Sequence, residues 1–348
     1  MIAAQDIRGM YAIIATPARE GADRLGATEG TVDLDETERL IEALVQDGVS
    51  GLIALGTTGE CATLSEPDYR AFVDCVLKTV RRRVPTFIGA TALGGHETVR
   101  RLRFVSEQGA DGTLLGLPMW QPVSQDMAVS FYAGISELFP DLGIMVYANA
   151  RAFRFNFPVE FWEAVFRSAP TVMSAKCSRA DGLREMISRT QGRIHFLPSD
   201  MVVQQFHALA PETTTACWAT AAGMNPMPSV ELMRAISAGD SKAAGDWVDA
   251  IGWANEPILP LVAKPEIFAQ YNIQVEKTRI NEAGYSRCGP VRPPYQHLPQ
   301  EYANYSREAG RRWASICMAW QPGIGFKLRP WEAGHSSAGT DLSATTGG

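Results

Sequence analysis

Lys176 has the surroundings that best suit a nucleophile in this sequence. It stands near the end of the apolar run TVMSAKC (171–177), which has the composition of a buried β-strand. Burial lowers the pKa of a lysine, and an amine that is neutral near pH 7 can attack a ketone to form an imine. A lysine that reaches from a strand end into solvent is the alternative, and the residues alone favour neither. The other lysines stand in polar helical contexts, before a proline or near the C-terminus: Lys78, Lys242, Lys277, Lys264 and Lys327.

Polar groups that a keto acid could use follow two further apolar runs. The segment GTTGE (56–60) presents Thr57, Thr58 and Gly59, whose hydroxyl and backbone N–H groups could bind a carboxylate without a cation. Tyr147 and Asn149 end another run, where a phenol can transfer protons and an amide can hold a water or a substrate oxygen. A plain loop and an aromatic core residue are the ordinary explanations of the first segment and of Tyr147.

Trp120 and Trp218 follow the fourth and eighth apolar runs. If both face the same end of the fold, they could pack a flat apolar substrate. Tryptophan is also a common core residue, so this interpretation depends on the other candidates.

Eight apolar runs, each followed by a helical stretch, must position these residues. Their apolar residues do not alternate strictly, as expected for parallel strands covered on both faces. The first run ends in Thr16–Pro17 and lacks the Gly-rich phosphate turn of a doubly wound sheet. We therefore predict a (β/α)8 TIM barrel over residues 8–227, with its site at the carboxyl ends of the strands. The expected strands are 10–17, 51–58, 85–92, 112–118, 143–149, 171–177, 193–199 and 213–219.

Beyond the barrel we predict a C-terminal helical extension at 228–320, with a Pro-rich connection at 289–299 and a last helix at 300–319. Residues 321–348 are small, polar and patternless, which is typical of a flexible tail.

Charge and composition exclude several classes of protein. The net charge of -6 argues against nucleic-acid binding. The N-terminus is not a signal peptide, and no apolar run approaches the ~20 residues of a membrane span. The six cysteines and five histidines show no metal-binding spacing. We therefore expect a cytoplasmic protein with reduced thiols, a small-molecule substrate, and no metal or other cofactor.

The Thr57–Thr58 pair, Tyr147 and Lys176 together resemble the pyruvate-dependent class I aldolases of the dihydrodipicolinate synthase and N-acetylneuraminate lyase superfamily. The resemblance extends over residues 8 to 320. It implies that GTTGE binds the substrate carboxylate, that Tyr147 relays protons and that Lys176 forms the Schiff base. It also implies a homo-oligomer, a tetramer in many members.

Within this superfamily the sequence most resembles the hydratase-aldolases of polycyclic aromatic degradation. Trp120 stands where the synthase has its second relay tyrosine, and Asn149 falls within the synthase's YNVPGR segment, which argues against lysine biosynthesis. The stretches that carry the resemblance are GTTGECATL (56–64), LGLPMW (115–120), VYANARAFRFNFP (146–158) and residues 271–295.

The resemblance implies cleavage of an aryl-substituted 2-oxobut-3-enoate to an aromatic aldehyde and pyruvate. Arg151 and Arg179 could pair with a carboxylate on the ring, or with surface acids. We therefore expect trans-2'-carboxybenzalpyruvate to be preferred over trans-o-hydroxybenzylidenepyruvate. The alternatives are another pyruvate-dependent aldolase or dehydratase of the superfamily, acting on a sugar acid or resembling the synthase, and a barrel that binds a keto acid without turnover.

Overall fold

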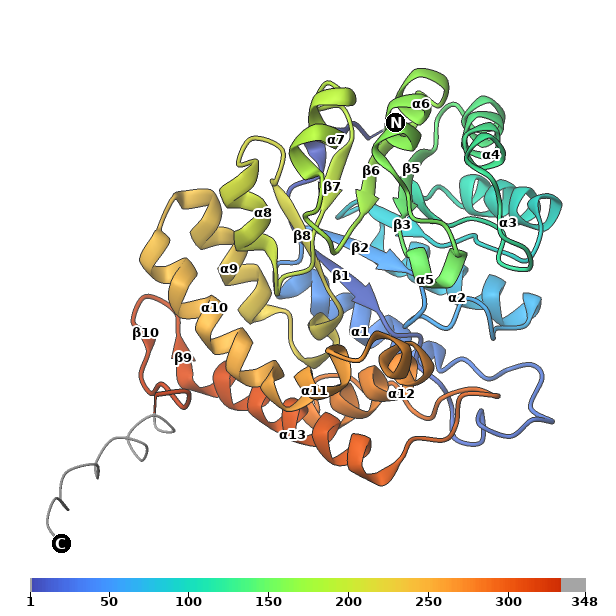
Figure 1. The fold of residues 1–348 in the computed structure, drawn as a ribbon. Coiled ribbons are helices and arrows are strands. Elements are labelled where there is room, and N and C mark those ends of the chain that lie inside the picture. Colours follow the sequence, from blue (N-terminus) through green and yellow to red (C-terminus); the bar gives the residue numbers. More distant parts are fainter. Residues whose placement is uncertain (1, 333–348) are drawn as a thin grey trace, which may run out of the picture.

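Eight parallel strands form a barrel in the computed structural model, which describes residues 2–332. The strands pair in the order β7-β6-β5-β4-β3-β2-β1-β8, and hydrogen bonds from Trp218 to Pro198 (2.9 Å) and from Asp200 to Trp218 (3.0 Å) join β8 to the end of β7. Helices surround this ring (Figure 1), so the prediction of a TIM barrel is confirmed. The strands are β1 (Gly9–Ile14), β2 (Gly51–Ala54), β3 (Thr86–Ile88), β4 (Gly112–Leu115), β5 (Gly143–Tyr147), β6 (Val172–Lys176), β7 (His195–Leu197) and β8 (Ala216–Ala219).

The strands are short and covered on both faces, which explains their lack of alternation. Every residue of β2, β3, β4 and β7 is buried. Side chains such as Tyr11, Phe87 and Met145 fill the interior of the barrel. Tyr147 and Trp218 pack on this interior cluster, so they form the floor of the barrel's carboxyl end.

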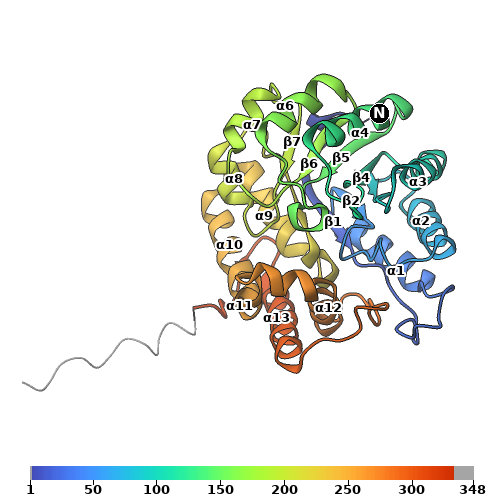
Figure 2. The ribbon, with the colours of Figure 1, turned by 45° about the vertical axis from the view of Figure 1, so that its right-hand side comes forward.

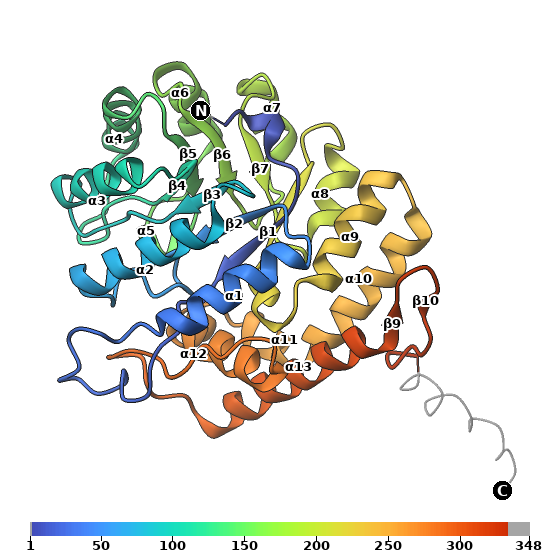
Figure 3. The ribbon, with the colours of Figure 1, turned by 180° about the vertical axis from the view of Figure 1, so that it is seen from behind.

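Helices follow the strands and begin where the sequence supplies caps. The side chains of Asp33, Ser65 and Ser124 accept hydrogen bonds from backbone N–H groups in the first turns of α1, α2 and α4. Figure 3 shows α1 and α2 on the outer face of β1 and β2. The helices of this layer are α1 (Leu34–Gln46), α2 (Glu66–Val80), α3 (Gly95–Glu107), α4 (Gln125–Leu138), α6 (Val159–Ser168), α7 (Leu183–Arg189), α8 (Val203–Leu209) and α9 (Met227–Ala238), while the short α5 (Ala150–Phe153) lies between β5 and α6.

α9 packs against β1 and β8 and completes the helical layer, although it lies beyond the predicted barrel boundary at residue 227. The chain continues through α10 (Ser241–Asn255), α11 (Leu259–Val262), α12 (Pro265–Ala283) and α13 (Gln300–Ala319). α12 and α13 pack along each other. Figures 1 and 2 show α11, α12 and α13 together below the barrel, on the side of α5. Since α5 follows the carboxyl end of β5, the extension lies beside the end where the site is expected.

The segment after α13 differs from the predicted flexible tail over residues 321–332. β9 (Trp320–Gln321) and β10 (Gly325–Phe326) form an antiparallel hairpin. The rings of Trp320 and Phe326 lie 5.6 and 4.5 Å from that of Trp247 on α10, and Trp331 packs on Phe326. These aromatic contacts hold the segment against the helices, and the rest of the predicted tail, 333–348, lies outside the described residues. Within residues 2–332, no helix has the length and apolar character to cross a membrane.

Candidate active site

Lys176 and Tyr147 stand beside each other at the carboxyl ends of β6 and β5. They are register partners on neighbouring parallel strands, which places their side chains on the same face of the sheet. The Lys176 Nζ lies 4.8 Å from the centroid of the Tyr147 ring and 3.5 Å from that of the Trp218 ring. Burial lowers the pKa of Lys176, and the charges of Tyr147 and Glu276 oppose this shift only in part. The site therefore favours the neutral amine that a nucleophile requires.

The Tyr147 hydroxyl is hydrogen-bonded to two other predicted residues, Thr57 and Asn149. It shares a 2.9 Å hydrogen bond with the Thr57 hydroxyl across the barrel mouth, and Asn149 Nδ2 donates to it at 3.4 Å. Burial raises the pKa of Tyr147. The Lys176 charge and the hydrogen bonds with Thr57 and Asn149 together lower this pKa by more than burial raises it, so the net shift is downward. A phenol with a lowered pKa exchanges protons more readily near neutral pH.

The GTTGE segment forms a tight turn after β2. The Glu60 N–H donates to the Thr57 carbonyl at 2.9 Å, and the Thr16 hydroxyl donates to the Gly59 carbonyl at 2.7 Å. A Cβ on Gly59 would lie 2.7 Å from the Leu55 nitrogen, so only glycine fits there. This close packing fixes the orientation of the threonine pair at the barrel mouth.

Asn149 and Trp218 are held by their own hydrogen bonds. Asn149 caps α5 by accepting from the Ala152 N–H at 3.2 Å, so its amide oxygen is engaged and its Nδ2 is directed at Tyr147. The Trp218 indole N–H donates to the Leu197 carbonyl at 3.1 Å, and this bond fixes the ring over Lys176. Trp218 therefore contacts the amine itself, a contact that its type and position alone could not specify.

Trp120, Arg151 and Arg179 lie further out than the residues around Lys176. Trp120 is 75% exposed, and its carbonyl accepts from Arg154 at 2.7 Å. Arg179 is 82% exposed and pairs with Asp181 at 3.0 Å. Arg151 donates to a backbone carbonyl at the start of α12, at 3.3 Å. Substrate contacts by these three residues stay predictions.

The sequence interpretation missed a buried ion cluster behind the GTTGE turn. Lys277 was placed in a polar helical context, which is wrong, since the residue is 1% exposed. Its Nζ donates to Glu60 Oε2 at 2.7 Å, and Arg292 Nη1 donates to the same oxygen at 2.7 Å. α12 is covered by α13 and by the 3-10 helix at Thr220–Met224, so polar residues on several of its faces are buried. The available signal was Glu60, a carboxylate in a buried motif that needs a cationic partner.

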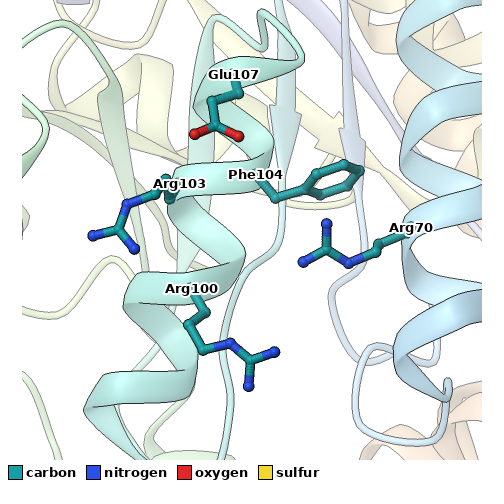
Figure 4. Close-up of a pocket in the computed structure, with 5 residues that line it drawn as sticks. All are labelled: Arg70, Arg100, Arg103, Phe104 and Glu107. Atoms are coloured by element: carbon teal, nitrogen blue, oxygen red, sulfur yellow. The ribbon is translucent and has the colours of Figure 1, made fainter.

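A surface hollow between α2 and α3 has an ordinary explanation. It has a volume of about 180 Å³ and is lined by Arg70, Arg100, Arg103, Phe104 and Glu107 (Figure 4). Arg70 stacks on Phe104 at 4.3 Å and pairs with Glu66, so its charge is already compensated. Among residues 2–332, no group of His, Cys, Asp and Glu could hold a metal ion.

Comparisons with known proteins find relatives over most of the chain. The family model described as "Dihydrodipicolinate synthetase family" matches residues 26–309. The trans-O-hydroxybenzylidenepyruvate hydratase-aldolase of Sphingobium xenophagum is 37% identical over 319 residues, which cover 89% of this chain and 95% of the relative. The trans-2'-carboxybenzalpyruvate hydratase-aldolase of Nocardioides sp. (strain KP7) is 34% identical over 328 residues, covering 90% and 95%.

A solved structure is similar over nearly the whole fold. The structure of PhdJ bound to a substrate intermediate superposes with a TM-score of 0.88 at 34% identity, covering 92% of this chain and 99% of that one. The chain is therefore a class I, Schiff-base lyase of the hydratase-aldolase kind. It belongs to the dihydrodipicolinate synthetase family.

Proposed function

We propose that this enzyme cleaves an aryl-substituted 2-oxobut-3-enoate to an aromatic aldehyde and pyruvate in aromatic hydrocarbon degradation. The observation that carries the proposal is the half-buried Lys176 amine beside Tyr147, whose hydroxyl bonds Thr57 at 2.9 Å. These groups suit an imine mechanism, because they supply an amine with a lowered pKa, a proton carrier and a carboxylate-binding turn.

The first steps form the imine and hydrate the alkene. Lys176 attacks the 2-keto carbon, Tyr147 protonates the departing hydroxyl, and a water molecule and a protonated imine result. Thr57, Thr58 and the Gly59 N–H bind the substrate carboxylate. The imine withdraws electrons along the conjugated chain, so water adds at the benzylic carbon and a proton is taken up at carbon 3. Asn149 would orient this water, since its Nδ2 lies 3.4 Å from the Tyr147 hydroxyl.

The remaining steps break the carbon–carbon bond. Tyr147 takes the proton of the new hydroxyl, the bond between carbons 3 and 4 breaks, and its electrons pass to the imine as the aldehyde forms. The pyruvate enamine is then protonated at carbon 3, and hydrolysis releases pyruvate and restores Lys176. Trp218, beside the imine, and Trp120, at the outer end of the site, would pack the aromatic ring.

For the ring substituent we propose a carboxylate first and a hydroxyl second, so trans-2'-carboxybenzalpyruvate precedes trans-o-hydroxybenzylidenepyruvate. Arg151 supports this order, because the Pro265 carbonyl that accepts its hydrogen bond is neutral and does not compensate its positive charge, which can attract a carboxylate. Arg179 supports it less, because Asp181 already pairs with it. Comparing kcat/KM for the two substrates tests the order, and a higher value for the hydroxyl compound would reverse it.

The mechanism is tested by trapping the imine. Pyruvate and borohydride should give a stable adduct on the peptide that contains Lys176, detected by mass spectrometry. Lys176→Met should abolish the adduct, whereas Lys242→Met, which changes an exposed lysine on α10, should leave it unchanged. A folded wild-type protein that gives no adduct would contradict the mechanism and favour a keto-acid-binding barrel without turnover.

We also propose a homotetramer in the cytoplasm. The tetramer rests on the family resemblance, and the cytoplasm on the six cysteines, all of which are free thiols. Sedimentation velocity tests the first proposal, and fractionation of the source cells tests the second.

A further inference from the structure

We propose that Lys277 and Arg292 are positioning residues of the carboxylate subsite, which hold the GTTGE turn through Glu60 and compensate its negative charge. This inference rests on the proposed binding of the substrate carboxylate by Thr57 and Thr58. It assigns part of the active site to the C-terminal region, since Lys277 lies on α12 and Arg292 on the segment between α12 and α13.

Both oxygens of Glu60 are bound by this region. Oε2 accepts from Lys277 Nζ and Arg292 Nη1, each at 2.7 Å, and Oε1 accepts from the Arg292 backbone N–H at 2.8 Å. Glu60 is 1% exposed, and its φ of 55° lies in the left-handed region that a side chain disfavours. The three bonds therefore hold Glu60 in a conformation that it would otherwise tend to leave, and the turn that begins at Thr57 is held with it.

Both cations have further partners, and those of Arg292 anchor it to the loop after β1. Lys277 also donates to the Pro290 carbonyl at 2.8 Å. Arg292 donates to the Thr31 hydroxyl at 2.8 Å and to the Pro17 and Thr31 carbonyls at 3.3 and 3.0 Å. The Thr31 hydroxyl donates to Asp68 at 2.6 Å. Counted together with Asp68, which the Thr31 hydroxyl links to Arg292, the cluster contains two cations and two carboxylates and is electrically balanced.

This balance matters because Glu60 is only two residues from Thr58. A buried carboxylate there, without compensation, would repel the carboxylate of the substrate. Two unit charges about 10 Å apart, at an effective dielectric constant of about 20, change a binding constant roughly tenfold. Lys277→Met leaves the cluster with a net negative charge, so we expect pyruvate to bind roughly tenfold more weakly.

The decisive comparison uses a second change that restores the balance. Glu60→Gln combined with Lys277→Met removes one charge of each sign, so the cluster is again neutral. If charge compensation is the role of Lys277, the double variant binds pyruvate more tightly than Lys277→Met does. If Lys277 only supports the packing of the turn, the double variant binds pyruvate no better than Lys277→Met does, because Glu60→Gln removes a further contact that holds the turn.

Pyruvate affinity is measured by isothermal titration calorimetry on the full-length wild type, both variants and Lys242→Met, a matched loss of an exposed lysine. Circular dichroism and thermal melts establish that each protein is folded. The expected result is weaker binding by Lys277→Met, recovery in the double variant and no change in Lys242→Met. An unchanged affinity of Lys277→Met, or the absence of recovery, would overturn the proposal.

Borohydride trapping of the same proteins separates this inference from the proposed function. Wild-type protein that binds pyruvate without forming an adduct refutes the imine mechanism, while calorimetry still decides the role of Lys277. Wild-type protein that forms the adduct, together with Lys277→Met of unchanged affinity, refutes the inference alone. Wild-type protein that neither binds nor traps pyruvate refutes both.

Discussion

Replacing Tyr147 by phenylalanine removes one hydroxyl from the centre of the site and leaves the ring in place. The ring packs edge-on against Phe153 with centroids 5.5 Å apart, a contact that phenylalanine preserves. The lost oxygen is the one that bonds Thr57 at 2.9 Å and accepts from Asn149 at 3.4 Å. The change should therefore affect proton transfer far more than folding.

The expected loss follows from the proton transfers assigned to this hydroxyl. A positioned general acid or base contributes about 10²- to 10⁴-fold to a rate, so kcat for cleavage should fall by about that factor. Imine formation with pyruvate should become slower, because Tyr147 no longer protonates the departing hydroxyl, but the adduct should still form, because Lys176 remains. The charge of Tyr147 raises the pKa of Lys176, so removing the phenol lowers that pKa further. Because the free amine is the reactive form, the midpoint of trapping against pH should move to lower pH.

The assay measures steady-state cleavage and borohydride trapping as functions of pH on the same preparation. Tyr132→Phe is the matched control: its buried hydroxyl donates to the Leu115 carbonyl at 2.9 Å, in the layer between barrel and helices. This control should lose about 1 kcal/mol of unfolding free energy with kcat unchanged. A Tyr147→Phe enzyme that cleaves within threefold of wild type would refute the role given to the hydroxyl.

Further predictions concern charge, an aromatic contact and substrate choice. Burial raises the pKa of Asp200 from 3.8 to about 6, so the folded state holds this proton more tightly and stability is lost as pH rises through that interval. Asp200→Asn cannot titrate at this position. Its unfolding free energy should therefore fall by up to about 3 kcal/mol less than that of the wild type between pH 4 and 7.5, measured by urea unfolding. Trp218→Leu removes the ring whose centroid lies 3.5 Å from Lys176 Nζ. An aromatic ring stabilises the protonated amine, so the midpoint of trapping should move to lower pH than in Trp218→Phe, which keeps a ring. Arg151→Met should lower kcat/KM for the carboxyl substrate by about 10- to 100-fold and leave kcat/KM for the hydroxyl substrate unchanged. Arg179→Met should change neither value. Equal effects of Arg151→Met on both substrates would exclude an Arg151–carboxylate pair.

The barrel was predictable because its strands are covered on both faces. Seven of the eight strands lie within an apolar run named from the sequence, β1 begins one residue before its run, and the helical stretches between the strands confirm the pattern. The closeness of Tyr147 and Lys176 followed from the same prediction, since consecutive strands of a TIM barrel are neighbours and both residues end their strands.

The hairpin after α13 was less accessible to sequence reasoning. Apart from Ile324 and Leu328, the residues between Trp320, Phe326 and Trp331 are Gly, Pro or polar, a composition typical of a tail. The order of this segment comes from Trp320 and Phe326, which pack on Trp247, 73 and 79 residues earlier in the chain, and from Trp331, which packs on Phe326. No local pattern shows where an isolated aromatic residue finds its partners.

The Glu60 cluster shows the same difficulty for charged residues. Lys277 is 217 residues from Glu60, and Arg292 is 232 residues away. Periodicity indicates which face of a helix is polar, but α12 has polar residues on several faces, so its buried face could not be identified. Chemistry offered a better criterion than periodicity. A glutamate in a motif fixed at a strand end, beside groups that should bind an anion, requires a cation within reach. This requirement predicts that a buried lysine or arginine exists, and only the fold identifies which one.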